Sequence, residues 1–222
     1  DDLILKKLHI KSPDNDLREW QDVVIRRLKC PQHEIRISVV GKYIALPDAY
    51  KSIYEALIHG GIANNTRVHI NKVDSEDLET TSDLVRHLQG SQGILVPGGF
   101  GTRGIEGKIR TVQYAREKNI PFFGICLGMQ VACIEFARNV CGLNGANSTE
   151  FDPGTKHPVI SLLEEQKNIR NMGATMRLGA YACKLSKNSL SYRGYKKENI
   201  SERHRHRYEL NKFYLTPISG LT

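Results

Sequence analysis

The sequence has no uninterrupted apolar run that approaches the length needed to cross a membrane. Its first residues, DDLILKKLHIK, are charged from the start and offer no apolar core of a signal peptide. The five cysteines form no CxxC pair and no Cys/His cluster at zinc spacing. These absences predict a soluble, cytoplasmic protein in a reducing compartment, with no membrane partner and no metal site.

A nucleic-acid binding pattern is missing as well. The formal net charge is +8, but Lys and Arg are spread along the chain and the aromatic residues do not interleave with them. A solvated basic surface is therefore favoured over a nucleic-acid groove, and no nucleic-acid partner is expected. The chain also contains no nucleotide-phosphate motif, so no cofactor is expected within these residues.

What the chain does contain is a regular alternation of strand and helix patterns. The patterns predict strands at 34–41, 66–73, 93–96 and 120–126, and helices at 48–61, 82–90, 104–119 and 127–142. Such alternation is typical of a doubly wound, mostly parallel α/β sheet with its functional loops at the carboxyl ends of the strands. After about residue 150 the pattern changes to strand-like pieces at 157–163, 175–185 and 202–210, which predict a smaller antiparallel elaboration near that edge.

Residues 1–33 form an extension with one helical pattern. The stretch NDLREWQDVVIRRL places Leu17, Trp20, Val24 and Leu28 on one face, with Asp16 as a candidate N-cap. The extension has too little apolar material to fold alone. We expect it to dock on the body of the protein or on a domain that precedes it, and we assign residues 34–222 to the main domain.

The stretch GICLG has the form G-x-nucleophile-x-G between a predicted strand and a predicted helix. Cys126 would lie at the sharp turn, at a helix N-terminus that favours a thiolate, and the N–H group of Leu127 would point at an oxyanion. The alternative is an inert core cysteine, which suits Cys133 on the apolar face of the next helix. Because a core cysteine needs no flanking glycines, the spacing favours a nucleophile.

Two further motifs leave alternatives open. The loop VPGGFGTRGIEGK is either a tight turn or an anion pocket that offers backbone amides near Gly98 and Gly99 to Cys126, and its position after a neighbouring strand favours the pocket. In SERHRHRYEL, strand alternation sends His204 and His206 to one face and the arginines 203, 205 and 207 to the other. This strand could supply a base or metal ligands, or it could be a polar edge strand, and metal binding is disfavoured because a third soft ligand is lacking.

Six stretches in order carry a resemblance to a known family: GKYIALPDAYKSIYEALIHGG, ILVPGGFGTRGIEGKI, IPFFGICLGMQ, NSTEF, GATMRLG and ERHRHRYE. The chain resembles, from about Asp1 to about Asn211, the C-terminal glutaminase domain of CTP synthases, which are class I glutamine amidotransferases with a flavodoxin-like fold. The combination of PGGFG with RHRHRYE makes this resemblance far more specific than the elbow alone.

The resemblance implies a reaction and a set of site residues. Cys126 would attack the side-chain amide of L-glutamine, form a glutamyl thioester and release ammonia, with the oxyanion held by Gly99 and Leu127. The implied glutamine contacts are Gly99, Leu127, Gly128, Met129, Gln130, Glu150 and Arg207. The resemblance also implies an N-terminal synthase domain in the same polypeptide, where ATP, Mg²⁺ and UTP act and ammonia gives CTP, and a homo-oligomer, a tetramer, in the full enzyme. Residues 1–33 would be the linker and docking helix toward that domain.

One departure from the family is clear. The family takes its catalytic base and orienting carboxylate from an H-P-E motif downstream of RHRHRYE, and no such motif occurs here; His157 and Pro158 are followed by Val159 and lie upstream. The triad His and Glu are therefore not assigned to any residue. Missing sequence is favoured over an omitted disordered stretch or a true loss of the triad. Two rival functions remain: a non-catalytic glutamine-binding or regulatory module, and a different cysteine hydrolase.

Overall fold

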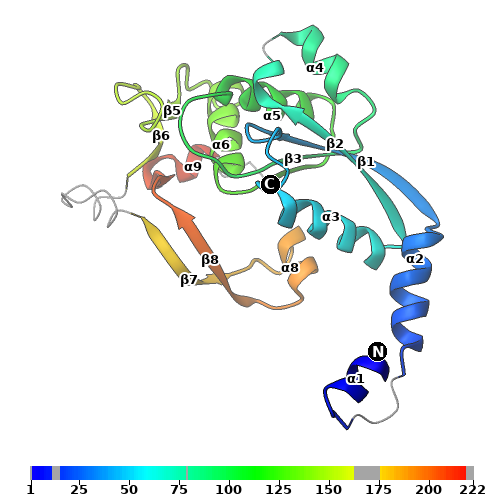
Figure 1. Cartoon of the computed structure of the whole chain (residues 1–222). Helices are drawn as coiled ribbons and strands as arrows, with labels where there is room; N and C mark the ends of the chain where they lie inside the picture. Colours follow the sequence, from blue (N-terminus) through cyan, green and yellow to red (C-terminus); the bar gives the residue numbers. More distant parts are fainter. Residues whose placement is uncertain (1, 12–15, 79, 163–175, 219–222) are drawn as a thin grey trace.

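The computed structural model describes residues 2–11, 16–78, 80–162 and 176–218 (Figure 1). Its centre is a four-stranded parallel sheet with the strand order β2-β1-β3-β4. The strands are β1 (His33–Gly41), β2 (Thr66–Asp74), β3 (Gly93–Val96) and β4 (Phe122–Gly124). The predicted parallel sheet is confirmed, and the strand order changes direction between β1 and β3, which is the place where ligands bind in open α/β sheets.

Helices cover both faces of this sheet. They are α3 (Lys51–Ala63), α4 (Thr81–Leu88), α5 (Ile105–Glu117) and α6 (Leu127–Asn139), with the short η2 (Ser75–Asp77) after β2. Helix α3 packs on β2, whereas α5 packs against both α4 and α6. The chain runs from β1 to β2 on one side of the sheet and then crosses back past β1 to β3 and β4 (Figure 1). Because each crossover is right-handed, a change in the direction of travel along the sheet puts the connecting helices on opposite faces.

The core lies between the sheet and helices α4 to α6. The sheet contributes fully buried residues such as Val40 and Val96, and α6 contributes Leu127, Val131 and Ile134. Strand β3 (GILV) and the last four residues of β1 (SVVG) are almost continuously buried, as expected for strands of a parallel sheet that is covered on both faces. The sheet and α6 together fix the positions of the strand ends.

The second half of the chain forms two smaller sheets. One has the order β5-β6-β9, in which β6 (Pro158–Ser161) pairs antiparallel with β9 (Glu209–Leu210) and parallel with β5 (Asn147–Ser148). The other is an antiparallel pair of β7 (Arg177–Lys184) and β8 (Asn199–His206), joined by α8 (Leu190–Tyr195). The predicted antiparallel elaboration is confirmed apart from the parallel β5–β6 pair. Residues 163 and 175, at the ends of two predicted strands, lie outside the described residues.

After β9 the chain continues through η4 (Lys212–Tyr214) and α9 (Leu215–Ile218). Helix α9 contacts α6, and Ile218 is buried in the main core. The end of the described chain is therefore packed against the helix that follows Cys126.

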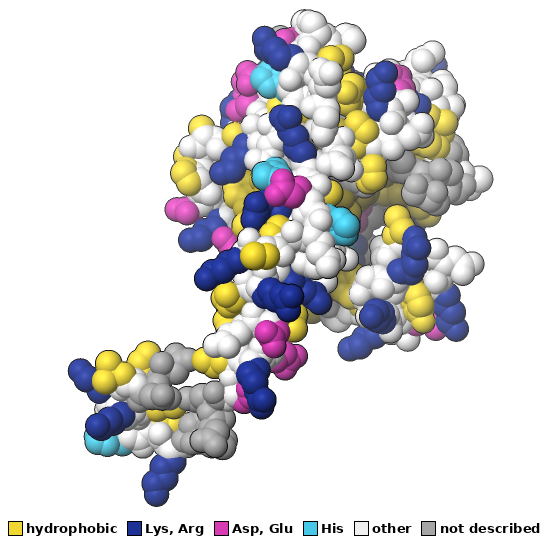
Figure 2. Space-filling model, turned by 90° about the vertical axis from the view of Figure 1, so that its right-hand side faces the viewer, with side chains coloured by type: hydrophobic (Ala, Val, Ile, Leu, Met, Phe, Trp, Pro, Cys, Tyr) yellow, Lys and Arg dark blue, Asp and Glu magenta, His cyan; other side chains and the backbone are white. Residues whose placement is uncertain are grey.

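The N-terminal extension stands apart from this body. It contains α1 (Asp2–Lys7), the π-helix η1 (Trp20–Ile25) and α2 (Arg26–Lys29). The Asp16 side chain accepts a hydrogen bond from the Arg18 N–H, but the cap position of η1 is Glu19, which makes no side-chain cap hydrogen bond, so the predicted N-cap at Asp16 is wrong. The predicted apolar face is only partly docked on the body, because Val24 is half-buried and η1 contacts α3, whereas Trp20 is 55% exposed and Leu28 is 49% exposed. Figure 2 shows the extension at the lower left, with apolar side chains on its surface.

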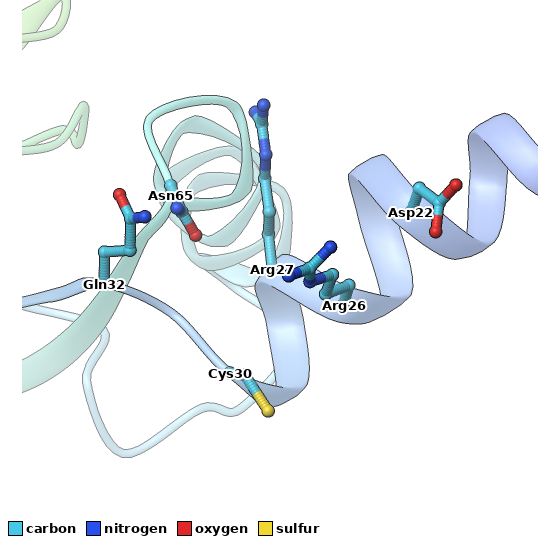
Figure 3. A pocket seen from close by; sticks show the side chains of 6 residues that line it. All are labelled: Asp22, Arg26, Arg27, Cys30, Gln32 and Asn65. Atoms are coloured by element: carbon cyan, nitrogen blue, oxygen red, sulfur yellow. The ribbon is translucent and has the colours of Figure 1, made fainter.

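The junction of the extension with the body encloses a cavity of about 460 Å³ (Figure 3). Arg27 crosses this junction and donates to the carbonyl oxygens of Ile62 and Ala63 at the end of α3.

No helix in the described residues is both long and apolar enough to span a membrane.

Candidate active site

The candidate site lies where three parallel strands end at the same edge of the sheet. Lys42 follows β1, the glycine pair Gly98 and Gly99 follows β3, and Cys126 follows β4. A Cβ atom added to Gly98 would lie 3.4 Å from the Cys126 Cβ and 3.9 Å from its sulfur. The expectation that the glycine loop faces Cys126 is therefore confirmed.

Cys126 has the strained backbone of a nucleophile elbow. Its φ of 54° and ψ of −106° lie in a region that residues with a side chain rarely adopt. The flanking glycines make the turn possible, since a Cβ on Gly128 would lie 2.0 Å from the Val96 carbonyl oxygen and one on Gly124 would lie 2.4 Å from the Gly128 backbone. The turn places Cys126 at the N-terminus of α6 and directs its side chain away from the core.

A narrow pocket opens in front of the Cys126 sulfur. It is lined by Gly99, Phe100, Cys126, Gln130, Glu150, His206, Arg207 and Tyr208. Five of these residues are site residues predicted from the sequence: Gly99, Cys126, Gln130, Glu150 and Arg207. The elements that meet here come from the loop after β3, from α6, from the segment after β5 and from the end of β8.

The other three predicted residues lie around this pocket rather than in its wall. Leu127 is fully buried and Gly128 packs against β3, so these two residues can offer only backbone groups. Met129 lines a second cavity of about 310 Å³ on the other side of Cys126. Cys126, Gln130, His206 and Tyr208 line both cavities.

Two pocket residues were missed from the sequence, Phe100 and Tyr208, whereas His206 was considered there as a possible base or metal ligand but was not assigned to the site. Phe100 follows the glycine pair directly and Tyr208 follows Arg207, so adjacency to predicted site residues was the available signal. The Tyr208 carbonyl oxygen accepts a hydrogen bond of 2.8 Å from the Gln130 side chain, which ties the end of the basic strand to α6.

Burial raises the pKa of the Cys126 thiol, and the carboxylates of Glu150 and Glu209 raise it further. The Leu127 N–H acts in the opposite direction and lowers this pKa. The helix N-terminus therefore favours the thiolate, as expected, but burial outweighs this effect and the pKa of Cys126 is raised overall. The sulfur lies 3.8 Å from the carbonyl oxygen of Arg205, as suits a thiol that donates a weak hydrogen bond.

Two histidines of the basic strand β8 and the Glu209 carboxylate of β9 lie in a row. His204 Nδ1 lies 2.8 Å from His206 Nε2, and His206 Nδ1 lies 3.1 Å from Glu209 Oε1. Arg177 donates to the same Glu209 oxygen at 2.8 Å. The predicted alternation holds within β8, since His204 and His206 are half-buried while Arg203 and Arg205 are exposed. It fails at Arg207, which follows the end of β8 and turns into the pocket.

No group of three or more His, Cys, Asp or Glu side chains is arranged to hold a metal ion in the described part of the chain. All five cysteines lie in that part and none forms a disulfide. The side chains that line the pocket thus carry a thiol, a carboxylate, a guanidinium, an imidazole, an amide and a phenol, from Cys126, Glu150, Arg207, His206, Gln130 and Tyr208.

Comparison with known proteins places this site in a family. The family model described as "Glutamine amidotransferase class-I" matches residues 45–219. The chain therefore belongs to the class-I glutamine amidotransferases. Within that family it corresponds to the glutaminase domain of CTP synthases.

The solved glutaminase domain of Trypanosoma brucei CTPS, with acivicin bound, is 43% identical, with a TM-score of 0.77; the match covers 84% of this chain and 72% of that one. The CTP synthase of Carboxydothermus hydrogenoformans is 53% identical over 221 residues, which is 100% of this chain and 41% of that protein. The CTP synthase of Methanocaldococcus jannaschii is 54% identical over 217 residues, 96% of this chain and 40% of that protein. The chain thus spans about two fifths of the length of these curated relatives.

Proposed function

We propose that this chain hydrolyses the side-chain amide of L-glutamine, with Cys126 as the nucleophile. The observation that carries the proposal is the arrangement of Cys126, in a strained elbow, opposite the glycine loop and in one pocket with Glu150 and Arg207. A glutamine molecule has the matching chemistry, because its α-ammonium suits a carboxylate and its α-carboxylate suits a guanidinium.

The reaction follows from these groups. The Cys126 sulfur attacks the amide carbon, and the oxyanion that forms accepts hydrogen bonds from the N–H groups of Gly99 and Leu127. The C–N bond breaks, ammonia leaves with the proton that the thiol lost, and a glutamyl thioester remains. Water then attacks the thioester carbon, which releases glutamate and returns the thiol. Gly128, Met129 and Gln130 would border the substrate from α6.

Because burial raises the pKa of Cys126, the attack requires a group that accepts the thiol proton. His206 is the histidine that lines the pocket, but its ring lies between His204 and Glu209. We therefore assign His206 to the shape and charge of the pocket and leave the role of base unassigned.

We further propose that the ammonia serves a CTP synthase. The curated relatives named CTP synthase are more than twice as long as this chain, and the chain matches two fifths of them. In this proposal a synthase part of the same polypeptide binds ATP, Mg²⁺ and UTP and uses the ammonia to form CTP in a homo-oligomer. Residues 1–33 would link and dock the glutaminase part to it, with their exposed apolar face as the contact surface.

The test of the glutaminase site uses the chloroketone analogue of glutamine, which keeps the α-ammonium and α-carboxylate and replaces the amide by a chloromethyl ketone. The protein at its natural length should be alkylated at Cys126, and glutamine should slow this reaction while a dipeptide without a glutamine side chain should not. Peptide mass spectrometry identifies the modified cysteine.

Two variants act as controls. Arg207→Met should weaken protection by glutamine, because the carboxylate partner is lost, whereas Arg193→Met on the exposed helix α8 should not. Alkylation spread over Cys30 and Cys183, or protection by peptides equal to that by glutamine, would refute a glutamine site at Cys126.

A further inference from the structure

Lys42 is a buried lysine that no part of the proposed reaction uses. It follows β1 directly and is only 3% exposed, although an ammonium group is costly to bury. Its Nζ donates to two backbone carbonyl oxygens of the loop after β3, those of Phe100 and Gly101, the second at 2.9 Å. The charge of Lys42 is therefore directed at the glycine loop and not at solvent.

One peptide unit links Lys42 to the pocket. The Phe100 carbonyl oxygen of this unit accepts from Lys42, and its Gly101 N–H donates to Glu150 Oε1 at 3.0 Å. A cation on the carbonyl side and a carboxylate on the amide side fix the orientation of the peptide plane. Rotation of this plane would break the contacts with Lys42 and Glu150 at the same time.

The surroundings hold Lys42 itself in place. Its own carbonyl oxygen accepts a hydrogen bond of 2.7 Å from Arg103, and Arg103 also pairs with Glu76. Gly101 adopts a φ of +74°, which favours glycine, and a Cβ added there would meet nothing within 4 Å. The loop thus depends on a backbone conformation that the Lys42 contacts stabilise.

We propose that Lys42 is a positioning residue for the glutamine site. Through the Phe100–Gly101 peptide it keeps the amide of Gly99 facing Cys126 and keeps the Glu150 carboxylate at the pocket. This inference rests on the proposed function and adds to it the group that fixes the positions of the oxyanion loop and of the Glu150 carboxylate relative to each other. If the inference is correct, loss of Lys42 slows the reaction of Cys126 with glutamine-shaped reagents but leaves the thiol itself reactive.

The test compares two electrophiles on the protein at its natural length. The chloroketone analogue of glutamine needs the loop and Glu150, whereas iodoacetamide is small and neutral and reports only on the thiol. For Lys42→Met we expect the chloroketone rate at Cys126 to fall by roughly 10- to 100-fold, the size of effect that small misplacements of a site produce. The iodoacetamide rate should stay within about threefold, so the ratio of the two rates changes. Lys72→Met, at an exposed lysine on β2, is the matched control and should leave both rates unchanged.

A second variant tests the inference if Lys42→Met does not fold. Gly101→Ala introduces strain into the same loop without a steric clash, and it should lower the ratio of the two rates about fivefold. Gly142→Ala is its control, because Gly142 also has a positive φ, of +68°, and open surroundings but lies after α6. A melting curve shows whether each variant is folded.

The outcomes are distinct. A folded Lys42→Met with an unchanged ratio overturns the inference, and so does an unchanged ratio in Gly101→Ala if Lys42→Met is unfolded. Equal loss of both rates in folded Lys42→Met also overturns it, because the residue would then support the elbow and not the loop. If the unsubstituted protein shows no protection by glutamine, the proposed function itself fails, and the inference fails with it.

Discussion

At the scale of the residue, Cys126 combines two opposing features. Its φ of 54° costs conformational energy, and its burial raises the pKa of the thiol. Only the raised pKa lowers the fraction of reactive thiolate, whereas the strained turn presents the sulfur to the pocket. The site is therefore built so that reactivity arises when a substrate and a proton acceptor are in place, which suits an enzyme that must not react with other electrophiles.

This account predicts how the thiol responds to pH and to Glu150. Thiolate is the form that reacts, and below the pKa its fraction grows as the pKa falls. Because the Glu150 carboxylate raises the Cys126 pKa, Glu150→Gln should lower that pKa and speed alkylation by iodoacetamide about twofold, as expected for one charge across a partly solvated site. The glutamine side chain keeps an oxygen that can accept the Gly101 N–H. Alkylation rates at Cys126 between about pH 7 and pH 10, measured by peptide mass spectrometry, check this.

The exposed Cys30 serves as the internal reference in the same experiment. The unsubstituted protein should alkylate more slowly at Cys126 than at Cys30 near neutral pH, and its Cys126 rate should keep rising into the alkaline range. A Cys126 that reacts faster than Cys30 at neutral pH would contradict the assignment of a raised pKa.

Much of the site could be predicted from single residues and their neighbours. Cys126 was identified by the glycines on either side of it, Gly124 and Gly128, and in the structure neither position has room for a Cβ atom. Glu150 and Arg207 were predicted from the family resemblance. Lys42 was not found, although its place directly after the first strand puts it at the right edge of the sheet. Lys42 donates its hydrogen bonds to backbone carbonyl groups. Because every residue has such a group, the sequence does not indicate which residues are its partners.

At the scale of the element, α5 is the support beneath the glycine loop. Gly107 lies so close to η2 that a Cβ there would be 1.9 Å from the Ser75 carbonyl oxygen. One turn of this helix also carries Lys108, which is fully buried and whose Nζ has no hydrogen-bond acceptor among the described residues. Burial, and then the charge of Lys42, lower the pKa of Lys108 to about 7.

This lysine makes stability depend on pH. The unfolded chain keeps the ordinary, higher pKa and so binds more protons than the folded chain between about pH 7 and pH 10. The free energy of unfolding should therefore rise with pH across that window, and should be lowest, with respect to Lys108, below about pH 7. Lys108→Met should remove this slope and raise the free energy of unfolding near pH 7 by on the order of 2 kcal/mol.

Urea unfolding of both proteins at several pH values measures this effect. Lys118→Met, at the exposed end of α5, is the control and should keep the slope. A Lys108→Met protein that is less stable than the parent at neutral pH would show that the amine has a partner that stabilises its charged form.

The elements themselves were largely predictable, because hydrophobic periodicity fixes strands and helices that lie in one core. The predicted strand at 34–41 and helix at 127–142 differ from β1 and α6 by a few residues at their ends. The short strand β5 and the π-helix η1 were not predicted, and β9 was predicted only as the end of one continuous strand at 202–210. Two-residue strands have no period to read, and a π-helix shares the sequence preferences of an α-helix.

At the scale of the whole molecule, the fold brings together residues that are far apart in the chain. The site joins the ends of β1, β3 and β4 with residues after β5 and at the end of β8, a span from Lys42 to Tyr208. The sequence predicts which ends of parallel strands share an edge, but not how the second half of the chain folds over that edge. Strand alternation alone placed Arg207 with the other arginines, whereas the family resemblance placed it among the pocket residues, and in the structure it lines the pocket.

The exposed apolar face of residues 1–33 belongs to this scale too. Leu3 and Ile4 of α1, Leu8 just after it and Trp20 of η1 are each more than half exposed, and exposed apolar patches mark interaction sites. This face is consistent with the proposed contact to a synthase part, since the curated relatives extend over more than twice the length of this chain.

The central claim, a glutamine-hydrolysing site built around Cys126, is tested most directly by release of glutamate from L-glutamine by the protein at its natural length. We predict steady glutamate production that is abolished in Cys126→Ala and retained in Cys133→Ala, whose cysteine lies buried in α6. Glutamate production that persists in Cys126→Ala, or its absence from a folded parent protein that still binds glutamine, would contradict the account.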